Sequence, residues 1–152
     1  GEYLAFLDDD DVWVADKLER QLAAFRETPE VDAVYGYGEQ FVSPELDAET
    51  HQRLSRRAGS IVPAPLPSTL LIRRSAFARV GPFDEALGLG VEMEWYARLC
   101  ESGIVTRMLE TVVYRRRLHA GNLNRTHAHE QPERLQVLKQ ALDRRRRAKA
   151  SE

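Results

Sequence analysis

The sequence is poor in several features that would each assign a protein class. Its 152 residues include one cysteine, Cys100, which excludes an internal disulfide and favours a reducing compartment. No apolar run approaches the roughly 18 residues that span a membrane, and no signal sequence opens the chain. The net charge of -2 gives nothing that attracts nucleic acid. We therefore expect a cytoplasmic protein without a nucleic-acid partner.

The chain does contain enough apolar sequence for one core. Hydrophobic residues make up 43% of it and charged residues 30%, which is typical of a globular domain. It does not begin with methionine, and its first apolar run, Tyr3 to Leu7, predicts a buried strand with a neighbour on each side. We therefore expect the later part of a larger α/β domain over residues 1–130, followed by a C-terminal basic helix over residues 131–152.

Four consecutive carboxylates, Asp8 to Asp11, end that first run. Folding tolerates such a cluster when it is solvated or when a cation lies among the charges, and hard divalent cations prefer oxygen ligands. In open α/β sheets, ligands bind beyond the carboxyl ends of strands, which is where this cluster falls. The cluster, followed closely by Trp13, is therefore either a charged turn or a metal site.

Apolar periodicity predicts a helix after the acidic cluster. Asp16 stands at its start, and Leu18, Leu22 and Phe25 recur at helical intervals until Thr28. The segment from Ser43 to Leu66 is polar and then rich in proline, so it predicts a loop. The other expected elements are strands at Val31–Tyr37, Ser68–Arg73, Ile104–Met108 and Thr111–Leu118, and helices at Ser75–Val80, at Glu92–Ser102 and from Pro132 onward.

The helix expected over residues 92–102 carries an unusually placed acid. On a helical wheel Glu92 falls near the centre of the apolar face, whereas Glu94 points away from it. A carboxylate among apolar side chains has to be neutralised or paired. Glu92 is therefore either stabilised by the free N–H groups of the first helical turn, or held partly desolvated as a general base that accepts a proton from a hydroxyl nucleophile.

His119 follows the last expected strand and precedes Gly121, so the strand delivers its side chain into a loop. An isolated histidine in such a place is usually structural. Beside an acidic site it becomes a candidate metal ligand, because an imidazole, carboxylates and phosphate oxygens together suit Mn²⁺ or Mg²⁺.

Four arginines, Arg144 to Arg147, end the last expected helix. The simplest explanation is a solvated helix end, because the helix dipole favours cations there. The alternative is contact with anionic lipid or with a partner, which would place this helix at the inner face of a membrane.

Four segments, taken in order, resemble those of the family 2 glycosyltransferases, which have the GT-A fold. YLAFLDDDDVW, from Tyr3 to Trp13, is similar to the strand and D-x-D motif of that family. The segment Leu70 to Leu87 resembles the one before the acceptor-side helix, and Val91 to Gly103 resembles that helix with its acidic motif. The segment Arg115 to Arg125 is similar to the late His-x-x-Asn segment. The resemblance implies an α/β, Rossmann-like GT-A domain that is incomplete and lacks the N-terminal nucleotide-binding strands.

The resemblance also implies roles for individual residues. Asp8 would approach the ribose or phosphate of a nucleotide-diphospho-sugar donor, and Asp10 would hold the Mn²⁺ or Mg²⁺ that bridges the diphosphate. His119 would bind the same metal, and Glu92 matches the position of the catalytic base. The implied reaction is a single in-line displacement with inversion at the anomeric carbon, in which an acceptor hydroxyl is the nucleophile and the nucleoside diphosphate leaves.

Two departures from the family pattern shape these expectations. The family commonly has aspartate where this chain has Glu92, and an acid where this chain has Val91. The half of the family domain that binds the nucleotide base is not found here, so we expect the chain by itself to lack activity.

Two other interpretations remain. An apolar strand followed by D-x-D-x-V also fits the haloacid dehalogenase-like phosphohydrolases, in which Asp8 would be the nucleophile and Asp10 its acid-base partner. Val91 and Glu92, in place of the commoner acids, also fit a domain that has lost activity and serves for binding or assembly. The transferase interpretation requires that the acidic cluster, Glu92 and His119 line one hollow.

Overall fold

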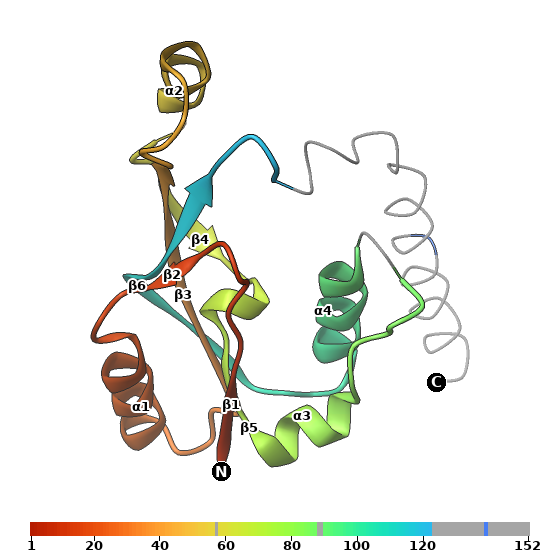
Figure 1. The fold of residues 1–152 in the computed structure, drawn as a ribbon. Helices are drawn as coiled ribbons and strands as arrows, with labels where there is room; N and C mark the ends of the chain where they lie inside the picture. The colour runs from red at the N-terminus through yellow and green to blue at the C-terminus, as the bar shows by residue number, and fades with distance from the viewer. Residues whose placement is uncertain (57, 88–89, 123–138, 140–152) are drawn as a thin grey trace.

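The computed structural model describes residues 1–56, 58–87, 90–122 and 139, which form a mixed sheet with helices packed on it (Figure 1). The predicted α/β class is therefore confirmed. The basic helix and the domain boundary predicted near residue 130 lie outside the described residues, apart from Lys139. In chain order the elements are β1 (Tyr3–Ala5), β2 (Val12–Trp13), α1 (Lys17–Glu27), β3 (Ala33–Val42), α2 (Ala48–Ser55), β4 (Ile61–Ala64), η1 (Pro67–Thr69), β5 (Leu71–Arg73), α3 (Arg74–Val80), α4 (Val91–Glu101) and β6 (Thr106–Leu118).

The strands run in the order β1-β5-β3-β6-β2, and β4 also pairs with β3. Strands β3 and β6 are parallel over their length, whereas the other pairs are antiparallel. The two strands predicted at 104–108 and 111–118 are one strand, β6. The register shifts on both sides of Tyr37 take up the extra residues of β6 as bulges, so Leu109 and Glu110 do not break the strand.

Two glycines in β3 allow β6 to lie close to it. A Cβ atom at Gly36 would come within 2.6 Å of both Val113 methyl groups, and one at Gly38 would come within 2.7 Å of the Tyr114 ring. Both distances are shorter than any carbon–carbon contact that packing permits. The absence of side chains at these positions therefore lets Val113 and Tyr114 fill the space over β3.

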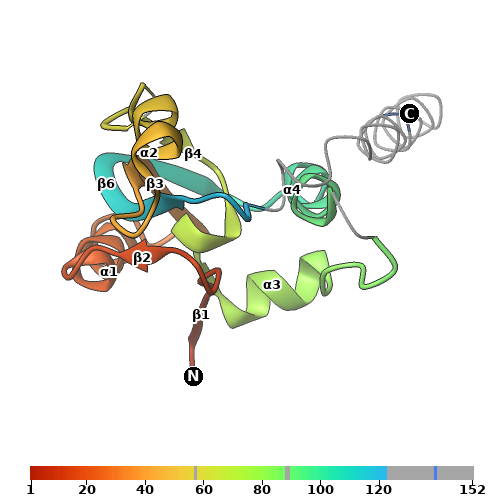
Figure 2. The same ribbon diagram turned by 45° about the horizontal axis from the view of Figure 1, so that its top comes forward.

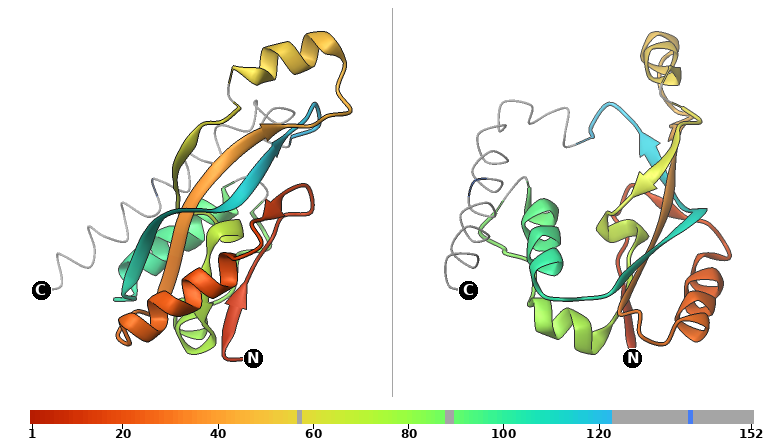
Figure 3. Two further views of the ribbon diagram at one scale, coloured as in Figure 1. Left: turned by 90° about the vertical axis from the view of Figure 1, so that its left-hand side faces the viewer. Right: turned by 180° about the vertical axis from the view of Figure 1, so that it is seen from behind.

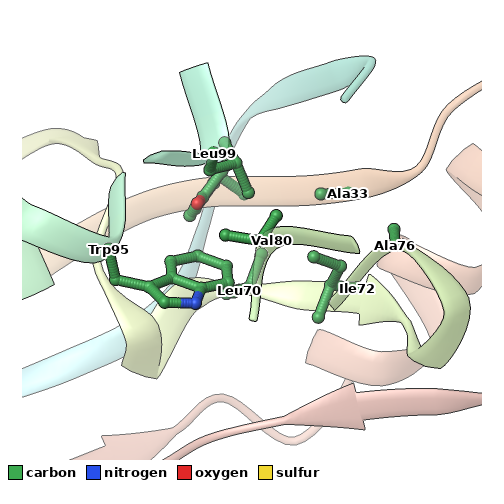
Figure 4. Packing of buried hydrophobic residues seen from close by; sticks show 8 residues of the cluster. Ala33, Leu70, Ile72, Ala76, Val80, Trp95 and Leu99 are labelled. Atoms are coloured by element: carbon green, nitrogen blue, oxygen red, sulfur yellow. The ribbon is translucent and has the colours of Figure 1, made fainter. Parts of the chain in front are cut away.

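The sheet has a helix layer on each side, with α1 on one and α3 and α4 on the other (Figure 2). Successive strand residues alternate between the two cores, because a strand points its side chains to opposite faces. Val34 packs with Phe25 of α1. Its neighbours in β3 belong to the other core, which is shown in Figure 4 and contains Ala33, Tyr35, Leu70, Ile72, Ala76, Val80, Trp95 and Leu99.

Strand β1 differs from the prediction of a buried strand with two neighbours. It spans Tyr3–Ala5, is half-buried, and within the described residues pairs with β5 alone. Phe6 leaves the sheet and packs against the rings of Phe77 and Phe83, at centroid distances of 5.6 and 5.5 Å. Leu7 is 46% exposed, so the apolar run includes residues that belong to the turn rather than to the strand.

The segment 43–66, predicted as a loop, contains α2 and β4. Asp47 caps α2 by accepting a hydrogen bond from the Thr50 N–H, at 2.9 Å. Leu54 is buried, although the rest of the helix is mostly exposed. Helix α2 extends beyond the end of β3 in Figures 1 and 3. No helix in the described ranges combines the length and the apolarity needed to cross a bilayer.

Helix α1 buries only part of the apolar face that was predicted, because Phe25 and Leu22 pack in the core but Leu18 does not. Leu18 is 42% exposed, whereas Lys17 and Gln21 are fully buried together with Ala24 and Phe25. The Lys17 ammonium donates to Gln21 Oε1 at 2.6 Å and to the carbonyl of Leu70 at 3.4 Å. These hydrogen bonds make a lysine acceptable at a buried position.

The burial of Lys17 predicts a pH-dependent stability. Desolvation lowers the pKa of Lys17 from 10.5 to about 8. Below pH 8 the lysine is protonated in both the native and the unfolded state; above it the native state releases the proton first, so the unfolded state binds more protons and stability rises with pH. We expect the free energy of unfolding to rise by about 2 kcal/mol between pH 8 and pH 9.5, relative to Lys17→Met.

Urea unfolding at several pH values measures this difference. Lys139→Met, at an exposed lysine, is the matched control and should follow the wild-type protein. Parallel pH profiles for the wild-type protein and Lys17→Met would contradict the prediction. The range stops at pH 9.5 because burial raises the pKa of Tyr35 and Tyr114, which lowers stability in every variant at higher pH.

Candidate functional site

The acidic turn, Asp8 to Asp11, connects β1 to β2 and is held through its main chain. The Asp11 N–H donates to the carbonyl of Asp8 at 3.2 Å, and the Asp8 N–H donates to Ser68 Oγ, also at 3.2 Å. The side chains of Asp8 and Asp9 are exposed, whereas Asp10 and Asp11 are half-buried. The turn therefore divides its four carboxylates into two that face solvent and two that face the protein.

Asp10 meets His119, which lies 109 residues away in the sequence. Asp10 Oδ2 and His119 Nε2 are 2.8 Å apart, and both side chains are about one-third exposed. The contact forms because β6 ends at Leu118 beside the acidic turn, so the next residue enters the turn from the strand's carboxyl end. The structure thus brings together the two residues that the sequence indicated as candidate metal ligands.

Arg117 fastens the acidic turn to β6. Its backbone N–H donates to Asp11 Oδ1 at 2.9 Å, and its Nε donates to the carbonyl oxygen of Asp10 at 3.0 Å. Burial raises the pKa of Asp11, the charges of Asp10 and Asp8 add to this, and the Arg117 N–H opposes it. Sequence reasoning missed Arg117, because only the pairing of β6 with its neighbours shows which of the three consecutive arginines, Arg115 to Arg117, faces the turn.

The ring of His119 has a defined hydrogen-bonding arrangement. The Gly121 N–H donates to Nδ1 at 3.2 Å, which makes Nδ1 an acceptor. In the neutral ring the hydrogen then lies on Nε2 and is donated to Asp10. Coordination of a metal through Nε2 requires the other tautomer, with the hydrogen on Nδ1.

Asp10 Oδ2 and His119 Nε2 are the two atoms here that could hold a divalent cation. Octahedral Mg²⁺ has bonds of about 2.1 Å, which place neighbouring ligands about 3 Å apart, and the observed separation is 2.8 Å. No group of three or more histidine, cysteine or acidic side chains in the described part of the chain is arranged to hold a metal. A cation held by these two atoms would replace their hydrogen bond, would need the His119 hydrogen on Nδ1, and would take its remaining ligands from phosphate oxygens and water.

Glu92 does not occupy the place that the helical wheel predicted. It is exposed in the first turn of α4, whereas Glu94 is buried, with 7% of its surface exposed. Glu94 is buried because Arg98, one helical turn later, lies 3.0 and 2.9 Å from its two carboxylate oxygens. A wheel that sorts residues by hydropathy cannot foresee a carboxylate that is neutralised within its own helix.

Arg98 and Trp95 fix α4 to the end of α3. The guanidinium of Arg98 also donates to the carbonyls of Val80 and Pro82, both at 2.7 Å. The indole N–H of Trp95 donates to the carbonyl of Gly81 at 2.8 Å, and the Trp95 ring packs against Phe77 and Phe83. These contacts hold the first turn of α4, which carries Glu92, relative to the sheet.

The first turn of α4 lies at the same end of the molecule as the acidic turn, as the two views in Figure 3 and the view in Figure 1 agree. The carboxyl end of β6 is also at this end. The structure therefore joins Asp10 to His119 by direct contact and places Glu92 on a separate element at the same end. Convergence of all three groups on one hollow stays a prediction.

Comparison with known proteins identifies the family. The chain matches the model of the family described as glycosyl transferase family 2 over residues 1–81, which is more than half of its length. The chain therefore belongs to glycosyl transferase family 2, and its mixed α/β sheet is consistent with part of a Rossmann-like GT-A domain. No curated protein matches the chain.

The match covers the acidic turn and ends at Gly81, before α4 and His119. Because it lies at the amino end of the chain, it does not confirm the prediction that the chain is the C-terminal portion of the family's domain. It gives no support to the phosphohydrolase interpretation.

The ion pair that anchors α4 gives a stability prediction. Arg98→Met removes the guanidinium from both oxygens of the buried Glu94 carboxylate and from the carbonyls of Val80 and Pro82, so we expect a loss of about 2 to 4 kcal/mol in the free energy of unfolding. Arg79→Met is the matched control, because Arg79 forms an ion pair with Asp32 at the same N–O distance of 2.9 Å but is half exposed. It should cost less than about 1 kcal/mol. Equal losses in urea unfolding would contradict the burial argument.

Proposed function

We propose that this chain forms part of the active site of an inverting, metal-assisted glycosyltransferase. The sugar would pass from a nucleotide-diphospho-sugar to an acceptor hydroxyl. The observation that carries the proposal is the 2.8 Å contact between Asp10 and His119 at the carboxyl ends of β1 and β6, within a chain of this family. In this proposal residues 1–130 belong to the catalytic domain.

Asp10 and His119 would hold the metal ion. A bound Mn²⁺ or Mg²⁺ would neutralise the negative charge that develops on the leaving diphosphate. The contribution of the chain is to supply one carboxylate and one imidazole from two elements that Arg117 ties together. Phosphate oxygens of the donor would complete the coordination.

Asp8 would face the nucleotide rather than the metal. Its N–H is bound to Ser68 Oγ, so the position of its backbone is set while its side chain extends to solvent. An exposed carboxylate next to the metal-binding residue can accept hydrogen bonds from ribose hydroxyl groups. This placement supports the role that the family resemblance implies for Asp8.

Glu92 would act as the general base. Glu92 is exposed in the first turn of α4, and the contacts of Arg98 and Trp95 hold that helix in place. A general base must reach the proton that it accepts through a hydrogen bond. The first turn of α4 lies at the same end of the molecule as the acidic turn, and this placement supports the role of Glu92.

The metal site is tested by binding. In the longest form of the protein we expect Mn²⁺-dependent binding of a nucleoside diphosphate, and we expect Asp10→Asn and His119→Ala each to weaken it by at least about tenfold, because each removes one of two protein ligands. Titration calorimetry with MnCl₂ and a panel of UDP, GDP, ADP, CDP and dTDP measures the affinity.

Asp9→Asn is the control for this test. It removes the same charge from the same turn, at an exposed position, so it should change the affinity by less than about threefold. Equal losses for Asp9→Asn and Asp10→Asn would indicate a diffuse charge effect rather than a metal ligand. Binding that is independent of Mn²⁺ would overturn the metal role.

The base is tested by turnover, in the longest form of the protein that transfers sugar. Glu92→Gln should lower the rate of transfer by about 10² to 10⁴-fold, because the neutral amide cannot accept the proton. Nucleoside diphosphate binding should stay within about twofold of wild type. Glu101→Gln, at an exposed acid near the other end of α4, is the control and should retain the wild-type rate. Unchanged turnover in Glu92→Gln would remove Glu92 from the mechanism.

A further inference from the structure

The loop that follows β6 is closed by a buried side chain, that of Asn122. Asn122 is 6% exposed, whereas its neighbours Ala120 and Gly121 are exposed. A buried carboxamide needs an N–H donor for its oxygen and acceptors for its two N–H groups. The partners of Asn122 therefore show which groups the loop is built to hold.

Asn122 contacts both halves of the site. Its Oδ1 accepts a hydrogen bond from the backbone N–H of His119 at 2.8 Å, and its Nδ2 donates to the backbone carbonyl of Arg117 at 3.1 Å. The same Nδ2 lies 3.5 Å from Asp10 Oδ2, the oxygen that also faces the His119 ring. The orientation of the carboxamide is unambiguous, because a flipped group would place its oxygen against the two acceptors of Arg117 and Asp10.

These contacts hold the main chain on both sides of Leu118. The side chains of Arg117 and His119 both reach the acidic turn, and Asn122 binds the backbone carbonyl of the first and the backbone N–H of the second. The backbone of Asn122 adds a bond of its own, from its N–H to the carbonyl of His119 at 3.4 Å. Asn122 therefore holds the backbone from which the His119 ring projects.

We propose that Asn122 is a positioning residue of this site. It fixes the orientation of the His119 ring relative to Asp10, and thereby the affinity of the pair for a metal–diphosphate complex. The identity of that ligand rests on the proposed function. The orientation of the ring in the metal-free protein does not rest on it and is measured separately.

The ring of His119 provides the first measurement. Nitrogen-15 NMR of the metal-free protein distinguishes protonated from unprotonated ring nitrogens, and comparison with His119→Ala assigns the signals. We expect wild-type His119 to show the hydrogen on Nε2, because Nδ1 accepts the Gly121 N–H. We expect Asn122→Ala to shift both ring nitrogens towards the average of two tautomers, because the loop that holds the Gly121 N–H against Nδ1 is then no longer closed by the carboxamide.

A second buried carboxamide provides the control. Gln21 is fully buried and donates to the carbonyls of Val34 and Thr69 at 2.8 and 2.7 Å, on the opposite side of the sheet from α4. Gln21→Ala removes a comparable set of hydrogen bonds and should lower the urea midpoint, while the His119 signals stay at their wild-type positions. If Asn122 only stabilises the fold, Asn122→Ala should likewise lower the urea midpoint and leave the His119 signals at their wild-type positions.

Affinity provides the second measurement, by calorimetry with Mn²⁺ and the tightest-binding nucleoside diphosphate of the panel. Asn122→Ala should weaken binding about tenfold, as is usual when a group that orients a metal ligand is lost. Asn122→Ser keeps an acceptor for the His119 N–H but is too short to reach Asp10, so its affinity should fall between those of the other two proteins. This variant also serves if Asn122→Ala does not fold.

The outcomes separate this inference from the proposed function. Wild-type His119 signals in both Asn122 variants would overturn the inference, whatever the affinities. Shifted ring signals together with a wild-type protein that binds no Mn²⁺–nucleotide complex would retain the positioning of His119 by Asn122 and reject the metal site. Shifted signals together with weakened binding would support both.

Discussion

The parallel pairing of β3 with β6 is the constraint on which the rest of this structure depends. It carries nine register pairs, from Ala33 with Thr106 to Val42 with Leu118, and thus fixes where the chain leaves the sheet after Leu118. Gly36 and Gly38 make the pairing possible, because any side chain there would overlap Val113 and Tyr114. Since β2 pairs with the other side of β6, the same strand also sets the position of the acidic turn just before β2. Both halves of the candidate site are therefore placed by one strand.

Charged groups inside this protein are held by short local pairs and by carbonyl groups. Glu94 is buried beside Arg98, and Lys17 is buried against Gln21 and the carbonyl of Leu70. In each case one partner is four residues away on the same helix, which allows burial without a matching charge on a distant element. The two helices can therefore pack with part of their polar faces towards the core. Fewer substitutions are tolerated at these buried polar positions as a result.

The acidic turn shows how a run of like charges is accommodated. Its backbone is bound by Ser68 Oγ and by the Arg117 guanidinium, and Asp11 accepts the Arg117 N–H, so the fold restrains the turn mainly through hydrogen bonds. Asp8 and Asp9 remain in solvent, where repulsion between them is screened. Asp10 is the carboxylate aligned with His119 and Asn122, which sets it apart from its three neighbours.

The order of the amino acids was enough to predict the α/β class, the acidic turn after the first strand, α1, α3 and α4 to within a few residues, and Asp10 and His119 as candidate partners. Each of these follows from local pattern or from motif order. Tertiary structure decided that β6 is one strand, that Lys17, Gln21 and Glu94 are buried while Leu18 and Glu92 are exposed, and that Arg117 and Asn122 hold the site together. The physical reason is that burial of a polar group depends on partners, such as the carbonyls of Leu70 and Val80, whose positions arise only when distant segments pack.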